Sequence, residues 1–409
     1  MKHLLLALMV CLLAVSCKQA EKPTAINIGT VDSLFSKTLN EQRKIWVHVP
    51  ESAKKSPGTK YPVVYLLDGD GHFYSVVGLI HQLSSNTRCP EMIVVGIPNT
   101  DRTRDLTPTH VKKVFGDTTF SKTSGGGENF TRFISDELIP YIDSHYPTTP
   151  YRTMIGHSLG GLMSVNTIVH HPDIFANYLA IDPSMWWDAR KLSNKSEPIF
   201  KEKKLTNKFL YVAVANTMRD GMQLADLAKD TTETTEHIRS ILEFCERTKA
   251  QAGSGLTFAS QYYADDDHGS VPLIAEYDAL RAMFSWYALK GLDVYFDPKA
   301  NKSASDLVDL LNAHYKDVST HFGYETLPPE EMVNGLGYGF MSNNMAEKAL
   351  AMFDLNLNNY PKSSNAHDSM GDYFLNQKDT ASAIDQFNEA LEIDEVAATR
   401  EKLNKLKKK

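Results

Sequence analysis

The sequence predicts an α/β fold in which helices cover a mostly parallel sheet, followed by a small all-helical region. Three observations support this prediction. Short apolar runs recur through the first 290 residues and alternate with stretches of helical periodicity. The longest runs are uninterrupted, which is typical of central strands covered on both faces. Beyond residue 330, small and aromatic residues repeat at a fixed interval, as in stacked helical hairpins.

The amino terminus has the features of an export signal. Lys2 precedes an apolar run that is too short to cross a bilayer. Residues 14–17 read Ala-Val-Ser-Cys and resemble a bacterial lipoprotein box, except that Ala14 stands where Leu is commoner. We expect residues 1–17 to be a lipoprotein signal with Cys17 as the lipidated first residue; a plain signal peptide cut nearby is the alternative. The mature chain would be anchored in the bacterial cell envelope, at a periplasmic or outer-membrane face, rather than span a membrane.

Charge and cysteine content exclude some classes of protein. The net charge of −7 argues against a nucleic-acid-binding protein, which is usually basic. If Cys17 carries lipid, Cys89 and Cys245 remain, and export would permit a disulfide between them. Their wide spacing favours two buried thiols instead. Their spacing does not resemble a metal-binding set, and we expect neither a metal nor a cofactor.

Strands are predicted where apolar residues alternate or run together, and helices where they recur at helical spacing. Residues 44–50 alternate with a period of two, as a half-buried strand does. Together, the predicted elements define a first domain at residues 26–290. Its further strands are predicted at 62–67, 92–97, 152–155, 178–181, 209–215 and 256–263, and its helices at 129–145, 162–169 and 273–287.

The carboxyl-terminal region repeats itself. After a connector at residues 291–329, residues 330–409 contain two copies of a 34-residue pattern and a charged capping helix. Asn356 stands where the repeat pattern prefers Ala, so the copies are imperfect. This period predicts two tetratricopeptide-like helix pairs, which pack on the rest of the chain and recruit a protein partner. The matching pairs are Leu336 and Met370, Gly337 and Gly371, Ala349 and Ala383, and Phe353 and Phe387.

A nucleophile motif lies between a predicted strand and a predicted helix. Residues 156–160 read Gly-His-Ser-Leu-Gly and match G-x-S-x-G. In this motif a sharp strand-to-helix turn exposes the serine, and the flanking glycines prevent clashes. We therefore predict Ser158 as a catalytic nucleophile; the alternative is a simple glycine-rich turn.

A serine nucleophile needs a base, which follows it in the chain in this class of site. His268 comes just after the last predicted strand, in an acidic loop, and is the predicted base. The alternatives are a surface histidine or a metal site formed with Asp265, Asp266 and Asp267. We assign no proton transfer to His157, whose side chain is expected to point elsewhere.

The acid that would orient His268 is the least defined member of the site. Asp220 follows strand 209–215, the usual position for this acid, and is ranked first. Asp182 follows strand 178–181, the other strand end known to supply it. Asp226 is a third candidate, and a Ser–His dyad without an acid stays open.

The oxyanion that forms during acyl transfer needs two N–H donors. The backbone amide of Leu159, directly after the nucleophile, is the first predicted donor. The second is the backbone amide of Asp70, in the glycine-containing loop after strand 62–67. The alternative for this loop is a tight turn that uses the same glycines.

Residues 26–290 resemble the esterase family that includes esterase D, mycolyltransferases, feruloyl esterases and enterobactin (siderophore) esterases. The resemblance implies an α/β-hydrolase fold, with Ser158, His268 and the Asp70 amide in the family's positions. The chain departs from the family at Asp182, where Ser is usual, so Asp182 is kept as a candidate acid. The stretches that carry the resemblance are Tyr65–Gly69, Ile97–Asn99, Arg102–Pro108, the nucleophile motif, Pro183–Trp187 and Asp267–Pro272.

Three further side chains are predicted to line a substrate pocket. Trp186 and Trp187 follow a strand end, although paired tryptophans are as often part of a core. Arg104, like Arg102, could bind a carboxylate or catecholate, but a structural pairing of Arg104 with Asp105 is an equal alternative. The triple glycine at 125–127 lacks a Lys-Ser/Thr pair and is predicted to be a flexible loop before a helix.

The sequence as a whole predicts a serine esterase that acts through an acyl-enzyme. The resemblance implies a small-molecule or glycan ester as substrate, such as a siderophore trilactone or an acylated polysaccharide. A mycolyl-type transferase is an alternative. A second alternative is a lipid-anchored scaffold with a non-catalytic hydrolase domain and protein-binding repeats.

Overall fold

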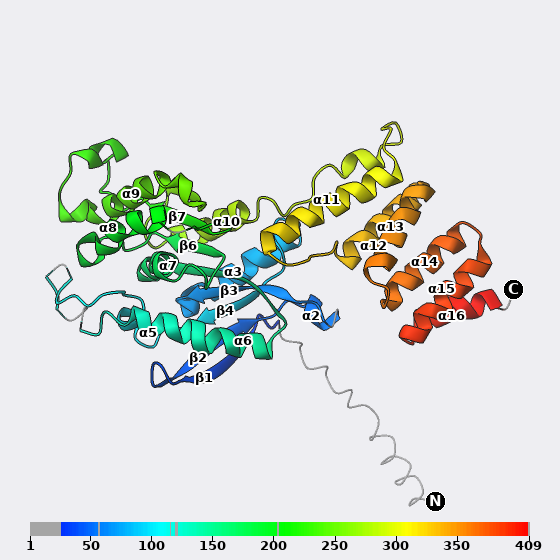
Figure 1. Ribbon diagram of the computed structural model, residues 1–409, viewed down its shortest axis with the longest axis horizontal. Helices are drawn as coiled ribbons and strands as arrows, with labels where there is room; N and C mark the ends of the chain where they lie inside the picture. The colour runs from blue at the N-terminus through cyan, green and yellow to red at the C-terminus, as the bar shows by residue number, and fades with distance from the viewer. Residues whose placement is uncertain (1–25, 56–57, 115, 119–121, 203, 408–409) are drawn as a thin grey trace, which may run out of the picture.

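The computed structural model describes residues 26–55, 58–114, 116–118, 122–202 and 204–407, so the predicted signal and Cys17 lie outside the described residues. These residues form an α/β domain followed by an array of helices that extends to one side of it (Figure 1). The two parts correspond to the predicted α/β domain and the predicted all-helical region.

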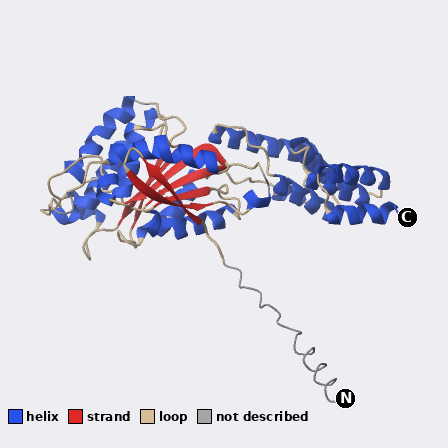
Figure 2. Cartoon of the chain, turned by 90° about the horizontal axis from the view of Figure 1, so that it is seen from below, coloured by secondary structure: helices blue, strands red, loops and turns tan. Residues whose placement is uncertain are grey.

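One eight-stranded sheet forms the centre of the α/β domain (Figure 2). The strand order is β1-β2-β4-β3-β5-β6-β7-β8. β2 pairs antiparallel with β1 and β4, and all remaining pairs are parallel. This topology confirms the predicted α/β-hydrolase fold. The strands are β1 Thr30–Ser36, β2 Glu41–His48, β3 Tyr61–Leu67, β4 Ile93–Ile97, β5 Thr148–His157, β6 Asn177–Ile181, β7 Phe209–Ala215 and β8 Thr257–Tyr263.

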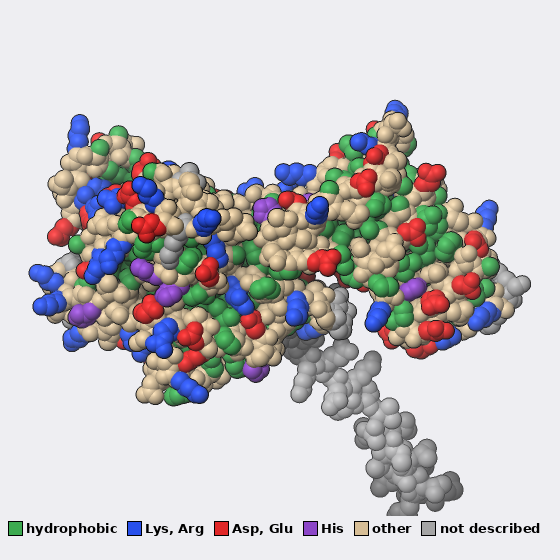
Figure 3. Space-filling model, in the orientation of Figure 1, with side chains coloured by type: hydrophobic (Ala, Val, Ile, Leu, Met, Phe, Trp, Pro, Cys, Tyr) green, Lys and Arg blue, Asp and Glu red, His purple; other side chains and the backbone are tan. Residues whose placement is uncertain are grey.

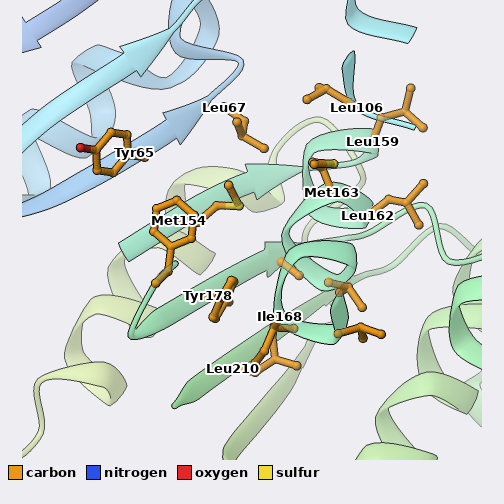
Figure 4. Packing of buried hydrophobic residues seen from close by; sticks show 14 of the residues in the cluster. Tyr65, Leu67, Leu106, Met154, Leu159, Leu162, Met163, Ile168, Tyr178 and Leu210 are labelled. Carbon is orange, nitrogen blue, oxygen red and sulfur yellow. The ribbon is translucent and has the colours of Figure 1, made fainter. Parts of the chain in front are cut away.

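Helices cover both faces of the sheet. α3 and α10 pack on one face and on each other. On the other face, Met163 and Ile168 of α7 pack over Tyr65, Met154 and other strand residues (Figure 4). Both faces of β3 and β4 are therefore buried, as their uninterrupted apolar sequences predict. The helices of this domain are α2 Ser52–Lys55, α3 Gly69–Ser84, α4 Arg102–Asp105, α5 Gly127–Arg132, α6 Ile139–His145, α7 Leu159–His170, α8 Trp187–Glu202, α9 Glu236–Lys249 and α10 Val271–Met283. Single turns or short 3-10 helices lie at η2 Leu224–Ala228, η3 Glu233–Thr235, η4 Ala252–Ser254 and η5 Asp293–Phe296.

Two predicted helical segments differ in detail. The helix predicted at 129–145 is interrupted by a π-helical segment, η1 Phe133–Leu138. The helix predicted to reach residue 287 ends at Met283, because Trp286 and the residues after it turn to pack on Phe322. The triple-glycine loop is packed rather than open, because a Cβ added to Gly125 would lie 2.5 Å from the backbone nitrogen of His110.

The two cysteines of the domain are free thiols, as their spacing predicts. Cys89 and Cys245 are both buried. They belong to the hydrophobic clusters on opposite faces of the sheet, so the strands separate them. Burial raises the pKa of each thiol to about 12, which makes both poor nucleophiles at neutral pH.

The helical array consists of two hairpins and a final helix that fit the predicted 34-residue repeats. A Cβ added to Gly337 would lie 2.6 Å from the ring of Phe353, and one added to Gly371 would lie 2.5 Å from that of Phe387. The same small-to-large contact therefore holds each hairpin closed. Asn356, the departure from the repeat pattern, is buried, and its side-chain amide has no hydrogen-bond partner within the described chain. The helices are α12 Glu330–Ser342, α13 Ala346–Asn359, α14 Ser364–Asn376, α15 Thr380–Ile393 and α16 Ala397–Lys407.

The predicted connector contains one long helix, α11 Ala304–Phe322. Its first half contributes Leu307 and Leu311 to the core of the helical array. Its second half contributes Val318 and Phe322 to the core under α3 and α10. α11 therefore joins the two parts through separate apolar contacts at its two ends.

The space-filling view shows mixed charges over the α/β domain and hydrophobic side chains gathered on the helical array (Figure 3). Among the residues that the structure describes, no helix has both the length and the apolar character needed to cross a membrane.

Candidate active site

Ser158 occupies a strained turn between β5 and α7. Its φ of 60° and ψ of −114° are unusual for a residue with a side chain, and such strain is typical of functional turns. The turn is tight: a Cβ added to Gly156 would lie 2.2 Å from the Gly160 carbonyl oxygen. The Ser158 N–H donates to the Ile181 carbonyl at 2.9 Å, and the Ser184 N–H donates to the Ser158 carbonyl at 3.0 Å. The backbone after β6 therefore fixes the turn.

A carboxylate and an imidazole meet next to this turn. Asp182 directly follows β6, and His268 lies in the loop between β8 and α10. The Nδ1 atom of His268 is 2.6 Å from Oδ2 of Asp182. Asp182 is fully buried, and its Oδ1 accepts the Ala215 N–H at 2.9 Å. The carboxylate is thus fixed on one side by backbone and presents the other side to His268.

A second histidine contacts the same carboxylate oxygen. The Nε2 atom of His237, in α9, lies 2.7 Å from Asp182 Oδ2. The indole N–H of Trp186 donates to His237 Nδ1 at 3.0 Å. Sequence reasoning missed His237, because a histidine inside an amphipathic helix carries no motif that would single it out.

The charge state of Asp182 follows from these contacts. Burial by itself raises the pKa of this carboxyl group. The hydrogen bonds from His237 and His268 outweigh burial and hold the pKa of Asp182 well below its usual range. Asp182 is therefore ionised at neutral pH and can stabilise a protonated His268.

The hydroxyl of Ser158 lies 3.5 Å from Ser184 Oγ, its only side-chain hydrogen-bond contact within the described chain. Hydrogen bonds between catalytic groups are often loose without substrate and tighten in the complex. Contrary to prediction, the His157 side chain does not point away: its ring packs on that of His268, with centroids 4.5 Å apart. Burial, together with the nearby His268 and His72, lowers the pKa of His157 to about 4, so this ring is neutral at pH 7.

The structure corrects the ranking of the acids. Asp220, ranked first, is exposed in the loop after β7 and makes no hydrogen bond to His268. Asp226 is also exposed, and its Oδ2 accepts the Gln223 N–H at 2.8 Å in a helix cap. Asp182, retained as an alternative, is the carboxylate that reaches the predicted base. The end of β7 lies nearby, since the Ala215 N–H donates to Asp182 and the Asn216 N–H to the Asp266 carbonyl, but the carboxylate that contacts His268 is the one after β6.

Both predicted oxyanion donors lie in the first turn of a helix. Leu159 is the first residue of α7 and Asp70 the second of α3, and such amides have no acceptor within their own helix. The two turns are adjacent, since a Cβ added to Gly160 would lie 3.1 Å from Asp68 Oδ2. Helix amides at this point favour developing negative charge.

Arg102 braces the two turns against each other. Its guanidinium donates to both oxygens of Asp68, at 2.7 and 2.9 Å, and to the His157 carbonyl at 3.2 Å. Asp68 has a positive φ of 51° directly before α3. Arg102 is therefore occupied within the protein rather than free to bind substrate.

Arg104 is also occupied, which contradicts its prediction as a pocket residue. Its guanidinium donates hydrogen bonds to both oxygens of Glu41, at 3.0 and 2.7 Å, and to Asp105 at 2.7 Å. Buried Arg43 bonds the same two acids. The structural pairing of Arg104 with Asp105 is thus the correct alternative.

The two tryptophans have different environments. Trp187 is buried, and its indole N–H donates to the Thr109 carbonyl at 3.1 Å. It lines a cavity of about 250 Å³ together with Asn166 and Lys191. Trp186 is partly buried beside His237 and hence next to the candidate catalytic groups.

Asp182, His237 and His268 form the one group in the described chain whose ligand atoms could surround a metal ion. Their separations of 2.6 and 2.7 Å are those of hydrogen bonds. Zinc, at about 2.0–2.2 Å from each ligand in a tetrahedron, holds its ligand atoms more than about 3 Å apart. The donor set as arranged therefore fits a hydrogen-bonded triad. Asp265, Asp266 and Asp267 do not come together as such a group among the described residues, and Asp267 Oδ1 accepts the N–H groups of Gly269 and Ser270.

Comparison with known proteins gives a family and several relatives. Residues 36–254 match the family model described as "Putative esterase". The chain is 28% identical over 205 residues to the ferri-bacillibactin esterase BesA of Bacillus subtilis, covering 47% of this chain and 71% of that protein. It is 26% identical over 240 residues to the siderophore enterobactin esterase of Emericella nidulans, covering 52% and 79%.

A solved structure is similar over most of the chain. The crystal structure of an IroE-like serine hydrolase from Shewanella oneidensis superposes with a TM-score of 0.68 at 29% identity. The similarity covers 81% of this chain and 99% of that one.

Proposed function

As a member of the family described as "Putative esterase", this chain is a carboxylic ester hydrolase, and we propose that it is a serine esterase acting through an acyl-enzyme intermediate. Ser158 is the nucleophile, His268 the general base and Asp182 the acid. One observation carries the proposal: Asp182 holds His268 Nδ1 at 2.6 Å, beside the strained turn that presents Ser158.

The acylation step follows from the protonation states. The Nδ1–H of His268 donates a hydrogen bond to Asp182, which leaves the unprotonated Nε2 as a base. His268 removes the Ser158 proton as the oxygen attacks the ester carbonyl carbon. The same imidazolium then protonates the leaving alcohol as the tetrahedral intermediate collapses to the acyl-enzyme. Ionised Asp182 stabilises the imidazolium throughout.

Deacylation repeats these roles with water. His268 takes a proton from water, whose oxygen attacks the acyl carbon, and returns the proton to Ser158 as the carboxylic acid leaves. In both steps the amides of Leu159 and Asp70 donate hydrogen bonds to the oxyanion. These donors are preorganised, because each sits at the fixed start of a helix.

For the substrate we propose an ester-linked siderophore of the cyclic trilactone class. The support comes from relatives, since the matched B. subtilis and E. nidulans proteins are named as ferri-bacillibactin and enterobactin esterases. An acylated polysaccharide is the competing substrate.

The test measures hydrolysis of p-nitrophenyl acetate and butyrate by residues 18–409, beside the Ser158→Ala variant. We expect turnover that falls to background in the variant, and a fluorophosphonate that adds to Ser158 in the wild type. Substrate class is then tested by chromatography of an iron-loaded trilactone and an acetylated glycan after incubation. Activity that survives Ser158→Ala would contradict the proposal.

We further propose that the chain is held at the cell envelope by lipid on Cys17. The apolar segment before Cys17 and the box-like sequence at 14–17 support this location. Metabolic labelling with an alkyne fatty acid, in wild type and Cys17→Ala, tests it. Equal labelling of the two proteins would contradict lipidation at Cys17.

A further inference from the structure

Two histidines share one oxygen of the buried acid. His268 Nδ1 and His237 Nε2 lie 2.6 and 2.7 Å from Asp182 Oδ2, and the two rings are perpendicular with centroids 5.1 Å apart. The other oxygen is taken by the Ala215 N–H. The Asp182 carboxylate therefore accepts hydrogen bonds from three donors. Orienting the proposed base requires only the bond from His268.

The indole of Trp186 decides the tautomer of His237. An indole N–H can only donate, so His237 Nδ1 must be the acceptor of the 3.0 Å bond and carries no proton. The proton of the neutral ring then lies on Nε2, which donates to Asp182. His237 is in this way held neutral and cannot itself act as a base toward Ser158, because both ring nitrogens are occupied.

Other titratable groups around the pair come from α8, α9, α3, α10, β5 and the His268 loop. On the α9 side, Glu236 is held by Arg190 of α8 and by Arg239. On the His268 side, the amides of Ser270 and Gly269 hold the pKa of Asp267 below its usual range, so this carboxylate is ionised beside His268 and stays so when His237 is substituted. His157 from β5 packs on the His268 ring. His72 of α3, beside His157, faces the buried carboxylate of Glu276. Asp182 is the group that connects His237 to His268 through hydrogen bonds.

We propose that His237 is a positioning residue. Its hydrogen bond to Asp182 Oδ2 weakens the attraction between this carboxylate and protonated His268, and so lowers the pH at which His268 becomes an active base. This inference rests on the proposed function of Ser158 and His268. A donor on the shared oxygen weakens the attraction between the carboxylate and a protonated His268. His268 consequently loses its proton, and Ser158 becomes reactive, in more acidic solution than a triad with a single donor would allow.

The test compares two substitutions of matched size. His237→Leu removes both the donor to Asp182 and the acceptor for Trp186. His237→Gln keeps both, since its amide nitrogen donates and its amide oxygen accepts. The measurement is the pH dependence of kcat/KM on p-nitrophenyl acetate, and in parallel the pH dependence of the rate at which a fluorophosphonate labels Ser158.

We expect the midpoint of the acid limb to move up by about 0.5–1 pH unit in His237→Leu and to stay near the wild-type midpoint in His237→Gln. A uniform loss of rate in His237→Leu with an unmoved midpoint would mean a structural role only and would overturn the inference. An equal shift in both variants would overturn it as well.

Two controls separate this inference from the proposed function. Wild-type protein that is not labelled at Ser158 would defeat the proposed function and the inference with it, whereas labelling with identical midpoints in all three proteins would defeat the inference alone. If His237→Leu does not fold, imidazole nitrogen NMR of the wild type decides. We expect the neutral Nε2–H form of His237 from pH 6 to 8; an imidazolium or Nδ1–H form there would overturn the inference.

Discussion

Asp182 Oδ2 lies 2.6 Å from His268 Nδ1, although the two residues are 86 positions apart in the chain. The loops after β6 and β8 bring them together at the edge of the sheet where β5 presents Ser158. The proposed acid thus follows β6, the strand next to β5 with the proposed nucleophile, one strand earlier than the position ranked first from the sequence.

The position of the acid can be checked with two isosteric substitutions. Asp182→Asn should lower kcat by about 10³–10⁴-fold, because the amide can no longer hold His268 in the tautomer that leaves Nε2 free. Asp220→Asn should change kcat less than about twofold, since Asp220 is exposed and makes no bond to His268. Steady-state kinetics on p-nitrophenyl butyrate measures both, and the reverse pattern would restore Asp220 as the acid.

The two arginines after β4 should have separable effects. Arg102→Ala should lower kcat by about tenfold to a hundredfold, because Arg102 ties the α3 turn to the nucleophile turn through Asp68 and the His157 carbonyl. Arg104→Ala should instead lower the melting temperature and leave kcat nearly unchanged, since its bonds go to Glu41 and Asp105. Kinetics and thermal unfolding of each variant decide; a raised KM for Arg104→Ala alone would favour its predicted role in substrate binding.

The half-buried His157 should make the protein less stable in acid. Its pKa is about 4 in the folded chain and about 6.5 in an unfolded one, so below pH 6.5 the unfolded state binds the extra proton. The free energy of unfolding should therefore fall by about 3 kcal/mol from this group as pH drops from 6.5 to 4. In His157→Gln the dependence over this window should flatten by that amount. Urea unfolding at several pH values measures it, and parallel curves for the two proteins would refute the contribution.

The small-to-large contact in the first hairpin is predicted to be essential to its packing. Gly337→Ala should destabilise the helical array by about 1–3 kcal/mol, because its Cβ would lie 2.6 Å from the Phe353 ring. Gly335→Ala, two residues away in the same helix, meets no atom within 4 Å and should stabilise the helix by up to about 1 kcal/mol. Denaturant unfolding followed by circular dichroism compares them. Equal effects would mean that the glycine contact does not determine the packing.

Truncation should show where the α/β domain ends. A chain cut after residue 328 keeps α11 and should stay folded and hydrolyse small esters at the wild-type rate. A chain cut after residue 300 loses Val318 and Phe322, which cover Tyr151 and the end of α10, and should lose about 3–6 kcal/mol of stability. Thermal unfolding and gel filtration test both. A stable, monomeric 26–300 fragment would show that α11 belongs to the helical array alone.

The sequence by itself determined the elements that depend on local pattern. Uninterrupted apolar runs identified β3 and β4, because both faces of these strands are buried. The 34-residue period identified the two hairpins, because the same contacts recur in each of them. The motif around Ser158 predicted the sharp turn between β5 and α7, because the strained φ of Ser158 and the glycines beside it are local requirements.

Tertiary structure decided which side chains become hydrogen-bond partners across distant parts of the chain. Asp182, Asp220 and Asp226 all follow β6 or β7, and only the folded positions of their side chains, with Asp182 buried against His268 and the other two exposed, select Asp182. The sequence left Arg104 either as a substrate-binding cation or as a partner of Asp105, and folding decides by placing Asp105 and Glu41 against its guanidinium. His237 enters the site from the first turn of α9, far from any motif. A hydrogen bond requires proximity in space, so this contact leaves no recognisable spacing in the sequence.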